Sequence, residues 1–167
     1  MYHFTDGGLR NIWLKSGYVE KKTPYGGGVS FSDIDGLTVA IACALCQKPG
    51  RLTGAEFRYI RSAMQYSQKF LGALFGYTEQ AVTKWEKYGK VPVLADAALR
   101  RVFQERDSRC GKPVSVTEVL SGLDHVAKVK IILSVRESKW NFVVEKDDVT
   151  ASINNENVRG VSTAGAG

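Results

Sequence analysis

The chain has few residues of the types that carry catalysis. It contains only two histidines in 167 residues, and His3 and His125 are isolated from each other in the sequence. No serine or cysteine lies in a recognisable nucleophile elbow, and the carboxylates fall mostly at helix starts or among surface charges. We therefore expect no enzyme, no catalytic residue and no cofactor.

Cysteine is also scarce, and the odd count of three is too small for a disulfide framework. It predicts reduced thiols. Cys43 and Cys46 form a C-x-x-C pair, which suits zinc or redox chemistry, with His3 or Cys110 as further zinc ligands. The pair falls in an apolar, alanine-rich stretch around Leu37 to Leu45, and no second ligand pair follows at ribbon spacing. We favour small core residues over metal ligands.

Long apolar runs are absent as well. No stretch of about 18 apolar residues occurs, and the first residues lack a charged segment followed by an apolar one. We expect neither a membrane span nor export, and therefore a cytoplasmic protein. With 44% hydrophobic and 24% charged residues, the composition predicts a folded core.

The net charge of +6 is concentrated in one segment. Residues 48–109 contain 12 basic and six acidic residues, whereas the segments before and after are formally neutral. A local basic excess indicates a polyanionic partner, either nucleic acid or an anionic membrane surface, unless it is only a solvated helical face. A membrane role would need the basic residues on one amphipathic helix, and here they are spread over several.

Short apolar clusters and glycine-rich breaks in residues 2–31 predict a small strand or hairpin unit. Gly26 to Gly28 are not followed by the Lys-Ser/Thr of a phosphate-binding loop, so we interpret them as a turn. A helix capped by Asp33 or Asp35 is expected from about Gly36 to Gln47.

Helix signals are strongest after the Lys48-Pro49-Gly50 break. Thr53 and Glu56 have the spacing of a capping box, and Leu52 with Phe57 suits a hydrophobic staple, which predicts a helix over about 53–65. Ser67 begins a second helix that ends at Gly76. Its predicted apolar face comprises Phe70, Leu71 and Leu74.

Thr78 is expected to cap a third helix over about 79–88. Ala81, Val82 and Trp85 form its apolar face, and the opposite face is polar. A fourth helix follows Pro92. Its predicted inward residues are Leu94, Ala98, Leu99, Val102 and Phe103.

The C-terminal third predicts a short helix over 115–123 and a β-hairpin from 128–135 and 139–144. This hairpin and the N-terminal strands are expected to form a small sheet. We divide the chain into an N-terminal strand and helix region (1–50), a basic helical domain (51–109), a helix plus hairpin (110–149) and a disordered tail (150–167).

The sequence resembles the helix-turn-helix repressors of the xenobiotic-response-element (XRE) and Cro type, in an antitoxin-like branch. The residues that carry the match are Ser67-Gln68, Leu71, Gly76-Tyr77-Thr78, Val82, Trp85-Glu86 and Pro92. Some relatives carry an N-terminal zinc module, but the matching start here, Thr5 to Gly8, lacks its cysteine pair. The resemblance implies an α+β fold, mainly an α-helical lambda-repressor-like core with a small β unit, and no metal.

The resemblance also implies that 51–109 is a helix-turn-helix DNA-binding domain and that its residues have roles in binding double-stranded DNA. Gln80 suits adenine, Lys84 suits guanine or a phosphate, Glu79 suits cytosine and Thr83 suits a thymine methyl group. Arg61 and Glu86 match a structural ion pair of the family. The expected phosphate-binding residues are Gln68, Lys69, Thr78, Lys87, Lys90 and Arg51.

Two functions follow as hypotheses. The first is a sequence-specific transcriptional regulator, a homodimeric repressor that binds a pseudo-palindromic operator through the major groove. The second is an antitoxin that binds a toxin protein and represses its own operon. Arg100, Arg101 and Arg106 are expected to face a second subunit or a neutralising carboxylate more than DNA.

Overall fold

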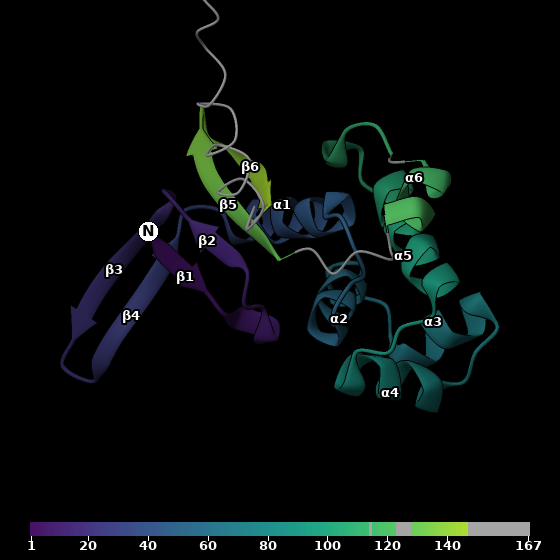
Figure 1. Ribbon diagram of the computed structural model, residues 1–167. Helices are drawn as coiled ribbons and strands as arrows, with labels where there is room; N and C mark the ends of the chain where they lie inside the picture. Colours follow the sequence, from purple (N-terminus) through teal and green to yellow (C-terminus); the bar gives the residue numbers. More distant parts are fainter. Residues whose placement is uncertain (114, 123–127, 147–167) are drawn as a thin grey trace, which may run out of the picture.

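Figure 1 shows the computed structural model, which describes residues 1–113, 115–122 and 128–146. Over these residues the fold is α+β, with six α-helices, two short 3-10 helices (η) and two β-sheets. The predicted tail, 150–167, lies outside them. The elements are β1 (Tyr2–Phe4), η1 (Asp6–Gly8), β2 (Ile12–Leu14), β3 (Tyr18–Thr23), β4 (Gly26–Phe31), α1 (Ile34–Gln47), α2 (Gly54–Ala63), α3 (Gln68–Phe75), α4 (Glu79–Tyr88), α5 (Val93–Arg106), η2 (Ser108–Cys110), α6 (Val116–Gly122), β5 (Val129–Arg136) and β6 (Lys139–Lys146).

The first two N-terminal strands and the C-terminal hairpin form one sheet, which confirms part of the prediction. Its strand order is β1-β2-β5-β6, and β2 pairs with β5 in parallel, with Ile12 opposite Ile131. The β5–β6 turn is made by Glu137 and Ser138, both with positive φ, which suits a tight two-residue hairpin. Strands β3 and β4 form a separate two-stranded sheet. The interpretation of Gly26 to Gly28 as a turn is wrong, because these glycines pair with residues 21–23 as the first part of β4, and the turn is made by Pro24 and Tyr25.

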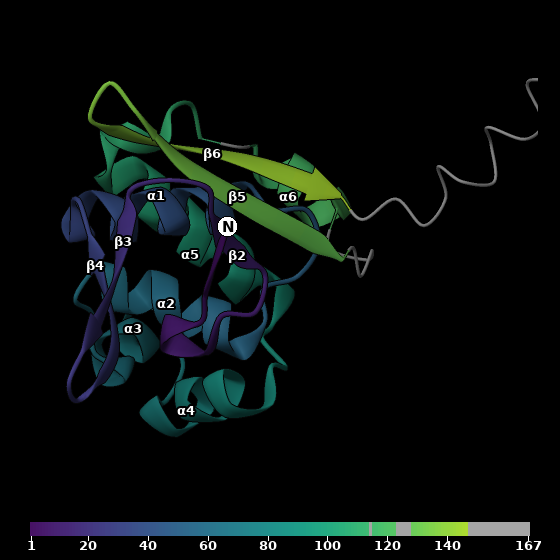
Figure 2. The same ribbon diagram turned by 90° about the vertical axis from the view of Figure 1, so that its left-hand side faces the viewer.

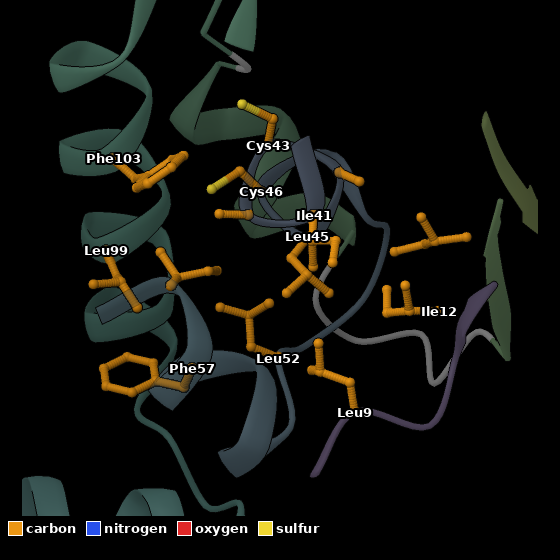
Figure 3. Packing of buried hydrophobic residues seen from close by; sticks show 14 of the residues in the cluster. Leu9, Ile12, Ile41, Cys43, Leu45, Cys46, Leu52, Phe57, Leu99 and Phe103 are labelled. Atoms are coloured by element: carbon orange, nitrogen blue, oxygen red, sulfur yellow. The ribbon is translucent and has the colours of Figure 1, made fainter. Parts of the chain in front are cut away.

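Helix α1 lies between the four-stranded sheet and the other helices (Figures 1 and 2). All seven residues from Ala40 to Cys46 are buried, as expected for a helix that is apolar on every side. Figure 3 shows Ile41 and Leu45 of α1 between Ile12 of β2 and Leu99 of α5. One hydrophobic cluster therefore joins the N-terminal strands, the helices and β5.

Local capping signals place the helix starts. Asp33 accepts a hydrogen bond from the Gly36 amide at the start of α1, so Asp33 and not Asp35 is the cap. Thr53 and Glu56 form the predicted capping box at α2. The staple residues Leu52 and Phe57 are both buried in the core.

The predicted inward faces of α3 and α5 are partly wrong. Phe70 and Leu74 on α3 are 50% and 51% exposed, and Leu94 on α5 is 71% exposed. On α5 the buried side instead includes an ion pair between Asp96 and Arg100. The prediction failed there because it assigned every charged residue to the solvent side. Of the other predicted inward residues of α5, Leu99 and Phe103 are buried, and Ala98 and Val102 are half-buried.

The prediction of reduced thiols is wrong for two of the three cysteines. A disulfide joins Cys43 of α1 to Cys110 of η2, 67 residues apart in sequence. Cys46 is a free, buried thiol, and desolvation by burial raises its pKa to about 12. The disulfide depends on α1 and η2 packing together, which a count of cysteines does not predict.

Two further observations concern membranes and metals. The longest helices among the described residues, α1 and α5, have 14 residues each, and none has the length and apolar character of a membrane span. Within the same part of the chain, no three His, Cys, Asp or Glu side chains are grouped as a metal site would require.

Candidate nucleic-acid interface

Helices α3 and α4 are joined by a tight turn at residues 76–78. The Ser67 hydroxyl accepts from the Phe70 amide at 3.0 Å and caps α3, and Gly76 ends α3 in the left-handed conformation, with φ of 77°. The Thr78 hydroxyl accepts from the Ala81 amide at 3.2 Å and caps α4. Helix α4 therefore has the bounds that the sequence predicted.

The inner side of α4 is packed tightly. Val82 and Trp85 are buried, and the rings of Trp85 and Tyr77 meet edge to face with centroids 4.7 Å apart. On α3, a Cβ added at Gly72 would lie only 2.9 Å from the Tyr77 carbonyl oxygen. The absence of a side chain at Gly72 thus lets α3 approach the turn before α4 closely.

The outer side of α4 is polar and open to solvent. We call five of the six exposed residues of α4, all except Tyr88, the outer face: Glu79, Gln80, Thr83, Lys84 and Lys87. In both ribbon views α4 lies at the end of the molecule away from the four-stranded sheet (Figures 1 and 2). The four predicted base-reading residues all belong to this face.

A hydrogen-bonded network fixes α4 to α2 and α3. Arg61 Nε and Nη2 donate to the two Glu86 oxygens at 2.6 and 3.1 Å, so the structure contains the ion pair that the resemblance implied. Gln68 Nε2 donates to Glu86 Oε2 at 2.8 Å, and the Thr83 hydroxyl donates to Gln68 Oε1 at 2.9 Å. Sequence reasoning did not anticipate these last two bonds, which leave one amide hydrogen of Gln68 for a phosphate.

The predicted phosphate-binding cations are all exposed. Lys69 lies in the first turn of α3, Lys87 in the last turn of α4, Lys90 just after α4, and Arg51 in the loop before α2. They do not form one cluster: Arg51 and Lys87 line a common cleft, whereas Lys69 and Lys90 do not line it.

The remaining charges of segment 48–109 are largely neutralised within the protein. Five of its six carboxylates form ion pairs with five of its 12 basic residues, which leaves Glu79 as the one carboxylate without an ion pair in this fully described segment. Arg58 and Arg106 donate to the carbonyl oxygens of Gly7 and Met64. Five cations of the segment make no ion pair or side-chain hydrogen bond to any described residue: Arg51, Lys69, Lys84, Lys87 and Lys90.

The three arginines of α5 have partners of their own. Arg100 is buried, pairs with Asp96 at 2.6 Å and donates to the Gly50 carbonyl oxygen at 2.6 Å. Asp96 in turn accepts from the Leu52 amide, so this pair holds the loop between α1 and α2. Arg101 pairs with Glu105 on the surface. Of the alternatives for Arg100 and Arg101, a neutralising carboxylate is therefore the one observed.

An open cleft of about 1080 Å³ lies beside the C-terminal end of α4. Its walls come from the loop between β1 and β2, the start of α2, the end of α4 and the start of β5. Sequence reasoning missed three of its basic residues, Arg10, Lys128 and Lys130. No local signal marks them, because the segments that contain them are formally neutral and become neighbours only through the β2–β5 pairing.

Searches against models of protein families, curated proteins and solved structures return no match for this chain. The resemblance to helix-turn-helix repressors accordingly stays an expectation from the sequence. The features that bear on function are the outer face of α4 and the cations around it.

Proposed function

We propose that the protein is a sequence-specific transcriptional regulator that inserts α4 into the major groove of double-stranded DNA as the second helix of a helix-turn-helix. One observation carries the proposal. The five cations of segment 48–109 that have no ion pair or side-chain hydrogen bond to any described residue are the five that we predicted to contact DNA. Internal neutralisation of the other charges supports a polyanion-binding surface around α4.

The outer face has the residue types that read base edges. Gln80 would pair with adenine N6 and N7, Lys84 with guanine O6 and N7 or a phosphate, and Glu79 with cytosine N4. The Thr83 hydroxyl is engaged by Gln68, so its methyl group is the part offered to a thymine methyl. Thr78, whose hydroxyl oxygen caps α4, keeps its hydroxyl proton for a phosphate.

The biological mechanism would be repression by a homodimer whose two α4 helices reach half-sites about one helical turn apart. A dimer bound to such a pseudo-palindromic operator would block access of the transcription machinery to the promoter. The antitoxin hypothesis is compatible with this mechanism, and it stays a prediction from the resemblance alone.

The test is binding of the full chain to duplex DNA from upstream of its own reading frame, compared with a scrambled duplex across a salt series. We expect the wild type to prefer the upstream duplex by roughly a thousandfold or more. Gln80→Ala and Lys84→Ala should each reduce that preference by about 5- to 150-fold, since a bidentate base contact contributes about 1–3 kcal/mol of discrimination.

Two matched variants serve as controls. Asn141→Ala removes an amide and Lys139→Ala removes a cation on β6, both exposed and outside α4. They should leave the preference unchanged. Equal binding of the upstream and scrambled duplexes by the wild type would sink the proposal, and so would Gln80 and Lys84 variants that behave like the controls.

A further inference from the structure

The cleft beside α4 has basic walls. Six of its lining residues are cations, and one of them, Lys48, is buried in an ion pair with Glu56 at 2.6 Å. The other five make no ion pair with any described residue. We call them the basic cleft: Arg10, Arg51, Lys87, Lys128 and Lys130.

The carboxylates of the cleft do not offset this charge at the surface. Glu56 is 2% exposed and accepts hydrogen bonds from the Lys48 ammonium, the Asn11 side chain and the Thr53 backbone amide. The Glu86 side chain is 5% exposed and is paired with Arg61. An anion entering the cleft therefore meets cations, while both carboxylates are covered and neutralised.

Tertiary structure brings these cations together from distant parts of the chain. The Ile131 amide donates to the Asn11 carbonyl oxygen at 2.8 Å, which continues the parallel pairing of β2 with β5 and sets Arg10 beside the start of β5. The Lys130 ammonium lies over the Trp13 ring, 5.1 Å from its centroid, and Trp13 also lines the cleft.

The basic cleft is continuous with the outer face of α4, because Lys87 belongs to both. The end of α4 is also in close contact with the start of α2, which contributes to the same cleft. Gly54, at the start of α2, packs directly on the backbone carbonyl of Glu86 near the end of α4, and a Cβ there would overlap it. A polyanion lying along α4 would thus reach the cleft without a change in the fold.

We propose that the basic cleft binds the phosphate backbone of duplex DNA flanking the base pairs contacted by α4, a role that rests on the proposed function. A small anion is the poorer fit, because the open cleft has a volume of about 1080 Å³ and its five cations come from four separate segments of the chain. The DNA-binding surface then includes the N-terminal strands and β5 in addition to α2–α4.

The test compares two triple variants of the full chain with equal loss of charge. The cleft variant carries Arg10→Ala, Lys128→Ala and Lys130→Ala. The control variant carries Lys21→Ala, Lys22→Ala and Lys139→Ala, which are exposed residues of β3 and β6 that do not line the cleft. Thermal unfolding of both, followed by circular dichroism, verifies that each is folded at the assay temperature.

Each protein is titrated with a short duplex limited to the base pairs that the wild type protects from nuclease cleavage in the upstream DNA. It is also titrated with a duplex extended by about one helical turn, roughly 10 base pairs, on each side. The slope of log affinity against log salt is measured for both. If three phosphate contacts are lost, the slope of the cleft variant on the long duplex falls by about 2.7, which corresponds to about 40-fold in affinity change between roughly 50 and 200 mM salt. The salt slope of the control variant on the same duplex should fall by much less.

The outcomes separate the two proposals. Phosphate contacts do not depend on sequence, so the slope difference should appear on scrambled duplex even if the wild type shows no sequence preference. A cleft variant with the affinity and slope of the control would overturn the cleft proposal while leaving base reading by α4 intact. The cleft proposal would also be overturned if the wild type bound one isolated strand of this DNA more tightly than the duplex and the cleft variant lost that preference.

Discussion

Glu86 links α4 to both α2 and α3, so its removal should both destabilise the fold and misplace the outer face. Replacing Glu86 with alanine deletes the acceptor of two bonds from Arg61 and one from Gln68. The Arg61 side chain is 13% exposed and would be left with only the Tyr66 carbonyl oxygen as acceptor. The main cost is therefore an uncompensated charge in a poorly hydrated place.

The magnitude follows from burial. Removing one partner of a buried ion pair costs about 3–5 kcal/mol, and the residual exposure of Arg61 reduces this to about 2–4 kcal/mol for Glu86→Ala. Arg61→Ala should cost a similar amount. The double variant should cost little more than either single one, because the second substitution removes the unpaired charge that the first created. The coupling free energy should then be about 1.5–3 kcal/mol.

Urea unfolding followed by tryptophan fluorescence measures this double-mutant cycle. Trp85 is buried on α4 and is the neighbour of Glu86 in sequence, and urea is uncharged and does not screen ion pairs. At a typical slope of about 2 kcal/mol per M, each single variant should lower the midpoint by about 1–2 M. Glu86→Gln should recover part of the loss, because it keeps an acceptor for Gln68. Additive single effects, with coupling below about 0.5 kcal/mol, would refute the conclusion that this network fixes α4.

Three further predictions concern other parts of the fold. Gly54→Ala should lower the free energy of unfolding by about 1–3 kcal/mol and weaken DNA binding, because the added Cβ overlaps the Glu86 carbonyl oxygen. Gly27→Ala should do neither, because the space around Gly27 is open. Equal urea midpoints for the two variants would contradict this prediction. Without reductant, a thiol reagent should react with no cysteine in the native protein and with one, Cys46, after denaturation. Three reactive thiols after denaturation would disprove the disulfide. Burial raises the pKa of the Tyr59 hydroxyl to about 12, so the unfolded chain ionises at this residue before the folded protein does. The contribution of Tyr59 to the free energy of unfolding is therefore fully present below a pH of about 10 and is lost as the pH rises towards 12. In urea unfolding across that range, Tyr59→Phe should reduce the loss by up to about 2–3 kcal/mol, and unchanged pH dependence would argue against the raised pKa.

Helix ends were predictable because their causes are local. The Thr78 cap and the Gly76 stop lie within a few residues of the elements they define, and both occur in the structure. The faces of α3 and α5 were harder. Leu94 is exposed because the buried side of α5 is used partly by Asp96 and Arg100, whose partners lie in a loop more than 40 residues earlier.

The candidate site divides in the same way. Gln80 and Lys84 were identified from the two-faced pattern of one helix, and the structure leaves both exposed. Arg10 and Lys130 were missed because they become neighbours of the α4 end only when β2 pairs with β5. The disulfide from α1 to η2 was missed for the same kind of reason.

By itself, the sequence determined where most helices begin and end, which face of α4 is polar, and that the excess positive charge belongs to segment 48–109. Only the tertiary structure decided which of those charges are available to a partner. The physical reason is distance along the chain: caps and periodic faces depend on residues a few positions apart, whereas ion pairs such as Arg61–Glu86 and the basic cleft depend on elements that folding brings together.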